Sequence, residues 1–257
     1  MSSETLEFSG CNFFRLRLAY SILSGRPIRI VSIRKNDDRP GIRDFEAKLI
    51  GMLEKVTNGT KVEISRTGTQ VNFRPGMITG GVVTVDCGAE RCISYFLEPL
   101  ILLSPFCKLA MTIKLKGVTN SPDEISVDGI KASWLKVYNK FVLNDEKLDI
   151  QIQCRGLKPE GGAKFTGWAL DSSAQVLAST FMTLCPKDVS HFLYGPLPMY
   201  SVHCLRHLKQ FFEIEFKMEE YQKIQKNEDA DLRTGSSDKA MITAVGVGYS
   251  NLNKTIL

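Results

Sequence analysis

A unit of secondary structure that recurs along the chain constrains its fold more than any other feature. Residues 34–69 contain the end of a strand, a charged turn closed by Pro40-Gly41, an amphipathic helix, and a strand that follows the turn at 57–59. The same order returns as a strand, a turn, a helix and a strand at residues 111–115, 118–122, 125–141 and 150–153. A repeated supersecondary unit is typical of stacked copies that share a core. We therefore expect repeated units, each with two helices over a small sheet.

Length and composition indicate a globular protein of the cell interior. The chain has 257 residues, of which 43% are hydrophobic, enough for one large domain or two smaller ones. Its net charge of +5 would suit RNA or an acidic partner, although solvated surface lysines produce the same balance. The first ten residues lack the pattern of a secretory signal. The most apolar window, residues 95–107, contains Glu98, Pro99 and Pro105 and is too short to span a bilayer, so we expect no membrane association.

The cysteines do not follow the spacing of a metal site or of a disulfide framework. Seven are scattered along the chain without a CxxC pair, at positions 11, 87, 92, 107, 154, 185 and 204. An odd number without paired spacing is typical of reduced thiols in the cytosol or nucleus.

Hydrophobic periodicity and turn residues predict the other elements. Phe45, Leu49, Met52 and Val56 recur at roughly 3.6-residue spacing and form one apolar helix face. By the same criteria we expect helices at 13–22, 93–103, 125–141 and 199–211, and strands at 6–8, 28–33, 62–65, 70–73, 82–86, 212–217 and 240–249. Residues 165–170 and 175–180 are expected to form a hairpin, and the polar residues 219–239 a mobile charged loop. Interleaved strands and helices predict the α/β to α+β class with mixed sheets.

The short motifs of common enzyme sites are missing from the sequence. It contains no GxxxxGK[ST], HExxH or GxSxG pattern. His203 and His207 lie one turn apart on the expected helix 199–211, which would suit a metal ion, but no carboxylate flanks them. Two surface histidines are the favoured interpretation, and we expect neither a metal nor a cofactor.

The same helix carries a basic stretch formed by Arg206, His207 and Lys209. Such a stretch is either a solvated helix face or a contact for RNA phosphates or an acidic partner. The sequence leaves both interpretations open.

A second charged region lies in the first turn, where Arg34, Arg39 and Arg43 alternate with acidic residues. Mixed charges of this kind usually form surface ion pairs of small energetic effect. Turns between a strand end and a helix start also bind anions, because unpaired helix N–H groups point toward them. The two interpretations carry equal weight, and they make these arginines candidates for an anion or RNA site.

Several separated motifs, in order along nearly the whole chain, resemble the RNA 3′-terminal phosphate cyclase superfamily. They are FxGxNxxRLR at 8–17, LSGRPIRI at 23–30, IRKNDDRPGIRDFE at 33–46, TNGT at 57–60, FRPG at 73–76 with GG at 80–81, RGLKPEGG at 155–162 and GVGYSNLNKT at 246–255. Within the superfamily they are most similar to the cyclase-like branch that works in ribosome assembly. The resemblance implies repeated units of two helices packed on a four-stranded mixed sheet.

The resemblance also implies a phosphate pocket, which is only partly kept. True cyclases form a covalent nucleotidyl–histidine intermediate with ATP and close the RNA 3′ end into a 2′,3′-cyclic phosphate. The pocket arginines are kept as Arg15 and Arg34, but Phe8 replaces a glutamate, Asp37 an arginine and Phe45 a glutamine. A buried, unpaired carboxylate at position 37 would repel a polyphosphate. We therefore expect no cyclase activity.

Two family features have no counterpart in the sequence. The histidine motif of the nucleophile is not found, and His191 is followed by what looks like a loop sequence, FLYG. Gly162 runs directly into AKFTGWALDSS, which resembles sequence beyond the family's inserted domain, and a second omission is expected near residues 187–190. The insert domain is therefore expected to be missing. The expected repeats are 1–76, 77–158 and an incomplete 159–257.

The resemblance implies a non-catalytic factor of the nucleus and nucleolus. It would belong to the small-subunit processome, dock an assembly GTPase and pre-ribosomal RNA, and support early pre-rRNA cleavage. Arg206, His207 and Lys209 would then lie on a docking face. One alternative is a pre-rRNA endonuclease in which the histidine and lysine act as acid and base. A residual cyclase is the other alternative.

Overall fold

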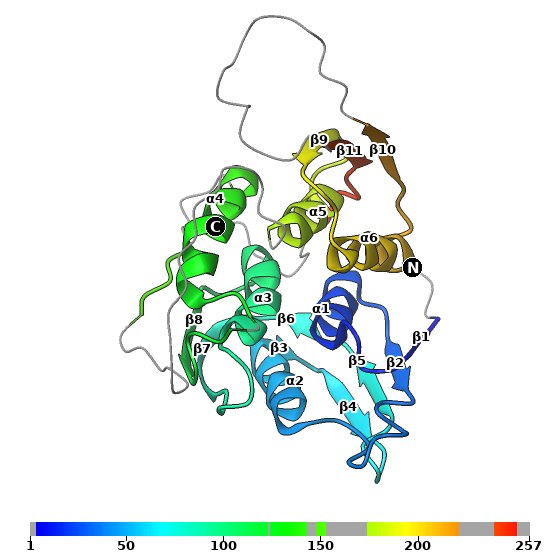
Figure 1. Ribbon diagram of the computed structural model, residues 1–257, viewed down its shortest axis with the longest axis vertical. Coiled ribbons are helices and arrows are strands. Elements are labelled where there is room, and N and C mark those ends of the chain that lie inside the picture. Colours follow the sequence, from blue (N-terminus) through cyan, green and yellow to red (C-terminus); the bar gives the residue numbers. More distant parts are fainter. Residues whose placement is uncertain (1–3, 123, 143–147, 153–173, 221–238, 251–257) are drawn as a thin grey trace, which may run out of the picture. The chain divides into compact units, whose positions relative to one another are not determined.

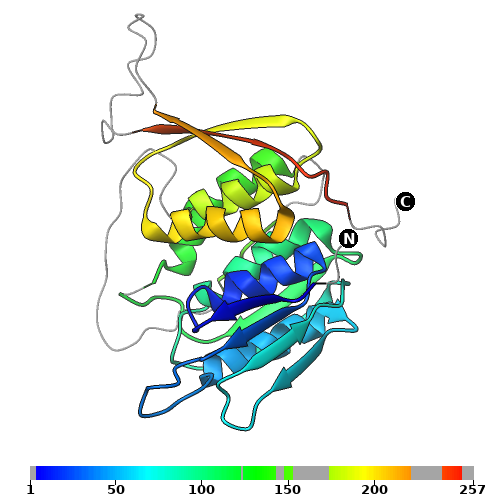
Figure 2. The same ribbon diagram turned by 90° about the vertical axis from the view of Figure 1, so that its right-hand side faces the viewer.

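A computed structural model describes residues 4–122, 124–142, 148–152, 174–220 and 239–250 (Figures 1 and 2). These residues form a mixed α/β structure with several small sheets and, within the described ranges, six α-helices. The chain divides into two compact units, which the described residues represent as 4–127 with Ser250, and 128–152 with 174–249. Each unit is described separately below.

The main sheet of the first unit has four strands and mixed direction. Its order is β1-β2-β5-β4, with bounds Leu6–Ser9, Ile28–Val31, Val71–Arg74 and Lys61–Ile64. The β1–β2 pair is parallel and the other two pairs are antiparallel. Alternate residues such as Phe8, Ile30 and Phe73 are buried, whereas Glu7 and Arg29 point to solvent on the other face. Helices α1 (Phe14–Ser24) and α2 (Asp44–Val56) cover the buried face (Figure 2).

The ends of these two helices are fixed by local hydrogen bonds. Helix α1 ends at Gly25, whose left-handed φ of 71° lets its N–H donate to the carbonyl of Ser21. Helix α2 begins at Arg43, whose N–H donates to the carboxylate of Glu46 at 2.7 Å. An acidic residue at this position satisfies an N–H that has no partner inside the helix.

Two small sheets and one further helix complete the first unit. Strands β3 (Thr57–Asn58) and β6 (Met77–Ile78) are antiparallel, and β7 (Gly81–Asp86) and β8 (Met111–Lys116) are parallel. Helix α3 (Ser94–Leu103) packs beside α1 and continues into a 3-10 turn, η1 (Ser104–Phe106). Gly76 is required where β3 and β6 meet, because a Cβ there would lie 2.2 Å from the carbonyl oxygen of Asn58.

The second unit contains a three-stranded antiparallel sheet and three helices. The sheet order is β10-β11-β9, with bounds Phe216–Glu220, Ala240–Val245 and Val189–Tyr194. The helices are α4 (Val127–Phe141), α5 (Gln175–Leu184) and α6 (Met199–Phe212). Helix α5 packs on α6 and on the sheet, and Phe181 contacts Tyr138 and Phe141 of α4.

Most predicted elements are confirmed, including the strand-turn-helix order of residues 34–69 and its return at 111–141. The first unit contains the expected four-stranded mixed sheet with two helices. The boundaries of the three repeats stay a prediction.

Four expectations for the later part of the chain are wrong. Residues 175–180 belong to a buried helix, because Ser179, Thr180 and Thr183 donate their hydroxyls to carbonyls four residues earlier and so tolerate burial. Residues 150–152 form no strand, and the expected strand at 212–217 begins only at Phe216, after α6 has ended. His191 lies in β9, where its ring is held by the hydroxyl of Thr243.

Two further expectations fall partly or wholly outside the described residues. Of the expected loop 219–239, Glu219 and Glu220 belong to β10, and residues 221–238 lie outside the described ranges. The same holds for residues 165–170 of the expected hairpin and for the sequence around Gly162.

Candidate functional site: an arginine–glutamate cluster and a basic helix

Three arginines of the first unit each form an ion pair with a glutamate whose side chain is largely shielded from solvent. The pairs are Arg15–Glu98, Arg34–Glu46 and Arg91–Glu124, which we call the arginine–glutamate cluster. The glutamate side chains are only 3%, 2% and 12% exposed. Their arginines are more exposed, at 23%, 17% and 39%, and therefore lie between the carboxylates and the solvent.

Arg34 binds Glu46 through both terminal nitrogens. The two N–O distances are 2.7 and 2.9 Å, and one nitrogen also donates to the carbonyl of Gly41 at 3.2 Å. The hydrogen bond to Glu46 raises the pKa of Arg34 above its usual value. Glu46 meanwhile accepts the N–H of Arg43, so one carboxylate both caps α2 and neutralises Arg34. Arg34, a candidate phosphate-binding residue, is thus already paired with a carboxylate of the protein itself.

Arg15 and Arg91 lie against aromatic rings at the starts of α2 and α3. The guanidinium of Arg15 is 4.7 Å from the ring centre of Tyr95, and that of Arg91 is 5.2 Å from Tyr95 and 5.1 Å from Phe45. The two rings pack edge to face at 5.3 Å. Guanidinium groups are attracted to ring faces at such distances. Phe45, which stands where the family pattern has a polar glutamine, therefore contributes an aromatic wall.

Backbone geometry is unusual at the carboxyl ends of β1 and β2. Phe13, Ser32 and Arg34 have positive φ values of 58°, 55° and 45°, which side-chain-bearing residues seldom adopt. Such residues often mark functional positions. The N–H of Gly10 donates to the carbonyl of Val31 and joins the two turns. Parallel strands end at one edge here, which is where α/β folds commonly bind ligands.

Phe8, which stands where the family pattern has a glutamate, packs under a buried arginine. The guanidinium of Arg17 lies 4.7 Å from the centre of the Phe8 ring and donates to the carbonyl of Gly10 at 2.9 Å. Burial lowers the pKa of Arg17 to about 10, which leaves it a cation at physiological pH. An aromatic ring thus takes the place of a carboxylate at this turn.

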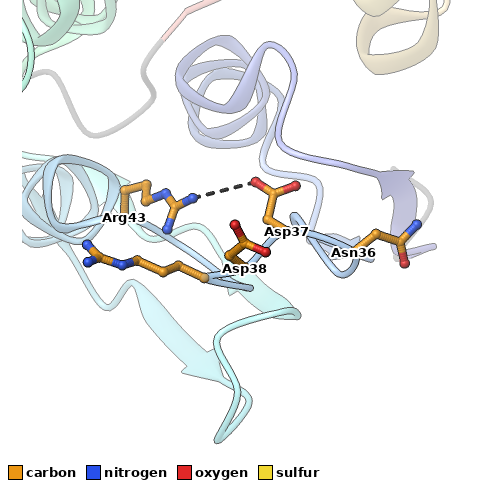
Figure 3. A pocket seen from close by; sticks show the side chains of 5 residues that line it. Asn36, Asp37, Asp38 and Arg43 are labelled. Atoms are coloured by element: carbon orange, nitrogen blue, oxygen red, sulfur yellow. Dashed lines mark hydrogen bonds and ion pairs between the residues drawn. The ribbon is translucent and has the colours of Figure 1, made fainter.

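Arg39 and Arg43 line an open hollow of about 490 Å³ together with Asn36, Asp37 and Asp38 (Figure 3). Arg43 pairs with Asp37 at 3.5 Å. The expectation that Asp37 is a buried, unpaired charge is wrong, because its side chain is 51% exposed and has this partner. The hollow is polar and carries charges of both signs, so it resembles a solvated turn rather than a closed phosphate pocket.

Helix α6 divides its three basic candidates between two faces. Arg206 and Lys209 are exposed, and Lys209 pairs with Glu215 at 3.0 Å. His207 is 5% exposed, and its Nδ1 lies 2.6 Å from the carbonyl oxygen of His203. The expectation of two surface histidines is therefore wrong for His207, which belongs to the buried face of the helix.

Sequence reasoning missed Glu98, Tyr95 and Arg91. A signal was present, since Glu98 stands inside the most apolar window of the chain, and a buried charge needs a partner. The identity of that partner depends on the packing of α3 against α1, which a single sequence does not reveal.

Within the described residues, no group of three or more His, Cys, Asp or Glu side chains is arranged to hold a metal ion. No helix among them is both long and apolar enough to cross a membrane.

Comparison with known proteins identifies the family. The family model for the RNA 3′-terminal phosphate cyclase matches residues 6–218. The chain belongs to this family. It is 59% identical to the probable RNA 3′-terminal phosphate cyclase-like protein of Caenorhabditis elegans over 379 positions that cover both chains fully. It is 31% identical to the human RNA 3′-terminal phosphate cyclase-like protein over 375 positions, and it lies in the cyclase-like branch.

A third relative has a name that mentions a process. The chain is 41% identical to the "rRNA processing protein rcl1" of Schizosaccharomyces pombe over 166 residues, which are 64% of this chain and 46% of that protein. The alignment with the C. elegans protein has 379 positions and this chain has 257 residues, so at least 122 positions have no residue here.

Proposed function

We propose that this chain is a non-catalytic factor in small-subunit rRNA processing that uses a cyclase fold as a docking surface. It would act in the nucleolus, within the small-subunit processome, and hold pre-ribosomal RNA beside an assembly GTPase during early cleavages. Its similarity to cyclase-like proteins, one of them named for rRNA processing, supports this proposal. No cofactor enters the proposed role.

The observation that carries the non-catalytic assignment is the occupation of both kept arginines by buried glutamates. A phosphate bound to the nitrogens of Arg15 or Arg34 that face these glutamates would have to displace Glu98 or Glu46, whose side chains are 3% and 2% exposed. A displaced carboxylate would remain buried without its counter-charge, which is strongly unfavourable. The pocket residues therefore serve the fold.

The test is incubation of the full chain with radiolabelled ATP and an RNA that ends in a 3′-phosphate, beside an active cyclase as positive control. We expect no label on the protein and no cyclised RNA end. We also expect the protein to be recovered from cells with pre-ribosomal RNA and an assembly GTPase. A labelled protein would overturn the assignment, and absence from pre-ribosomal particles would overturn the role.

We place the docking face on the exposed side of α6. Arg206 and Lys209 lie there, where they can meet RNA phosphates or acidic side chains of a partner. Arg206→Glu should weaken recovery of the partner or the RNA, since it replaces an attraction by a repulsion. Arg66→Glu is the matched control, because Arg66 is an exposed arginine of the first unit. Equal recovery of both variants would remove α6 from the proposal.

The endonuclease alternative receives less support from the geometry of α6. An acid–base pair would need both groups at the substrate, but His207 is buried on the opposite side from the exposed Lys209. His207→Ala should therefore lower stability, and neither the wild type nor this variant should cleave a pre-rRNA fragment. Loss of cleavage of a pre-rRNA fragment by a folded His207→Ala protein would favour the alternative instead.

The repeat organisation belongs to the same proposal. We infer three repeats, 1–76, 77–158 and 159–257, of which the last is incomplete. The alignment positions without a residue here, at least 122, support an omission, and the motif order suggests that it lies after Gly162 and near residues 187–190.

A further inference from the structure

Glu98 differs from the other two glutamates of the arginine–glutamate cluster. Glu46 and Glu124 each accept a backbone N–H, from Arg43 and Cys92, and so hold the starts of α2 and α3. The ion pair of Glu98 instead joins two helices, because Glu98 lies on α3 and Arg15 on α1.

Arg15 has the surroundings of a residue that binds anions. It is the second residue of the 11-residue helix α1, where the positive end of the helix dipole favours negative charge. Its guanidinium lies on the face of Tyr95, and its side chain is 23% exposed, so solvent anions can reach it. Guanidinium groups bind carboxylates and phosphates through the same donors.

We propose that Glu98 is a built-in anion that closes an otherwise functional phosphate site at Arg15. The carboxylate pairs with the guanidinium through Nε, so we expect no phosphate response from the wild-type protein. Neutralising Glu98 would open the site to a phosphate dianion from solution. The closure of this site by Glu98 does not depend on a role of the chain in rRNA processing.

The closed state should be strongly favoured. A phosphate that displaced Glu98 would leave a carboxylate that is 3% exposed without this partner. Breaking a buried ion pair in this way weakens competing binding by about 10²- to 10⁴-fold. A site with a dissociation constant of about 1 mM when open therefore has one of about 100 mM or more when closed, well above the ~20 mM phosphate of the test below.

The test compares thermal unfolding of wild type, Glu98→Gln and the matched control Glu54→Gln in increasing inorganic phosphate at constant ionic strength. Glu54 is an exposed glutamate of α2, so its change removes the same charge elsewhere in the first unit. For a site with a dissociation constant of ~1 mM, ~20 mM phosphate raises the ratio of folded to unfolded protein about 20-fold. This corresponds to a rise of roughly 3–7 °C in the melting temperature. We expect this shift in Glu98→Gln only. The general stabilisation that phosphate gives every protein appears equally in all three.

A fourth protein, the double variant Arg15→Met/Glu98→Gln, tests whether Arg15 is the residue that binds the phosphate. It should lose the phosphate response, because the guanidinium is gone. If Glu98→Gln is unfolded without phosphate, phosphate should restore its near-ultraviolet circular dichroism while leaving the double variant unaffected. Three results in the melting experiment would contradict the proposal: the phosphate-induced shift of Glu98→Gln is no larger than that of Glu54→Gln, wild type shows the same shift as Glu98→Gln, or the double variant keeps the shift. Failure of phosphate to refold an unfolded Glu98→Gln protein would contradict it as well.

Discussion

Arg34→Met should be among the most destabilising single changes in the first unit. The methionine keeps an apolar stem of similar length but leaves the carboxylate of Glu46 without its two hydrogen bonds of 2.7 and 2.9 Å. The side chain of Glu46 is 2% exposed, so water cannot replace the lost partner. Removing one member of a buried ion pair costs about 3–5 kcal/mol.

A double-mutant cycle separates the pair from other effects. Glu46→Gln keeps an oxygen that can accept the N–H of Arg43, so the cap of α2 survives while the charge is lost. The double variant Arg34→Met/Glu46→Gln removes both charges and should be more stable than the sum of the single changes predicts, by about 2–3 kcal/mol.

The assay must report on the first unit. Trp134 and Trp168 lie outside residues 4–127, so tryptophan fluorescence is unsuitable. Urea unfolding by far-ultraviolet circular dichroism, combined with hydrogen exchange of peptides from α2, measures the loss directly. Arg29→Met is the matched control, because the Arg29–Glu7 pair is exposed and should contribute less than about 1 kcal/mol. Equal effects of Arg34→Met and Arg29→Met, or a coupling energy near zero, would refute the reasoning.

Three further outcomes follow from packing and burial. Gly76→Ala should lower the melting temperature, because the new Cβ would lie 2.2 Å from the carbonyl oxygen of Asn58. Gly51→Ala inside α2 should instead stabilise the protein by up to ~1 kcal/mol, because its Cβ would meet nothing within 4 Å. Burial raises the pKa of Cys87 from 9.0 to about 12, so mass spectrometry after iodoacetamide treatment at pH 8 should show Cys11 modified well before Cys87. The unfolded chain releases the Cys87 proton above pH 9 while the folded chain keeps it, so the urea midpoint of wild type should fall between pH 9 and 12 more than that of Cys87→Ala.

The predictable part of the fold is local. The helix of residues 44–56 has an apolar face of regular period, and β5 alternates buried Val71 and Phe73 with more exposed residues, so both can be found from pattern alone. Helix α5 could not be found in this way. It is buried on every side, so it has no polar face to mark the helical period, and its serine and threonine residues suggest a strand.

The candidate site is only half predictable for a related reason. Motif order singles out Arg15 and Arg34, which the structure places in the first turn of α1 and in the turn that follows β2. It does not show that α3 brings Glu98 to Arg15, because that contact joins residues separated by 83 positions. His207 shows the same limit, since its helix is predicted correctly but the buried side of that helix depends on its packing against α5.

The ion pairs of Arg15 and Arg34 explain their presence in the chain without a bound phosphate. In an active phosphate pocket, arginine supplies positive charge that the ligand neutralises. In the arginine–glutamate cluster, three guanidinium groups already face three carboxylates, so the ion pairs themselves are neutral. Arg15 and Arg34 are nevertheless difficult to replace, because the loss of either would remove the ion-pair partner of a buried carboxylate. The fold alone is therefore a sufficient reason to keep Arg15 and Arg34, and their presence is no evidence of phosphate binding. The residues that distinguish the two cases are the glutamates.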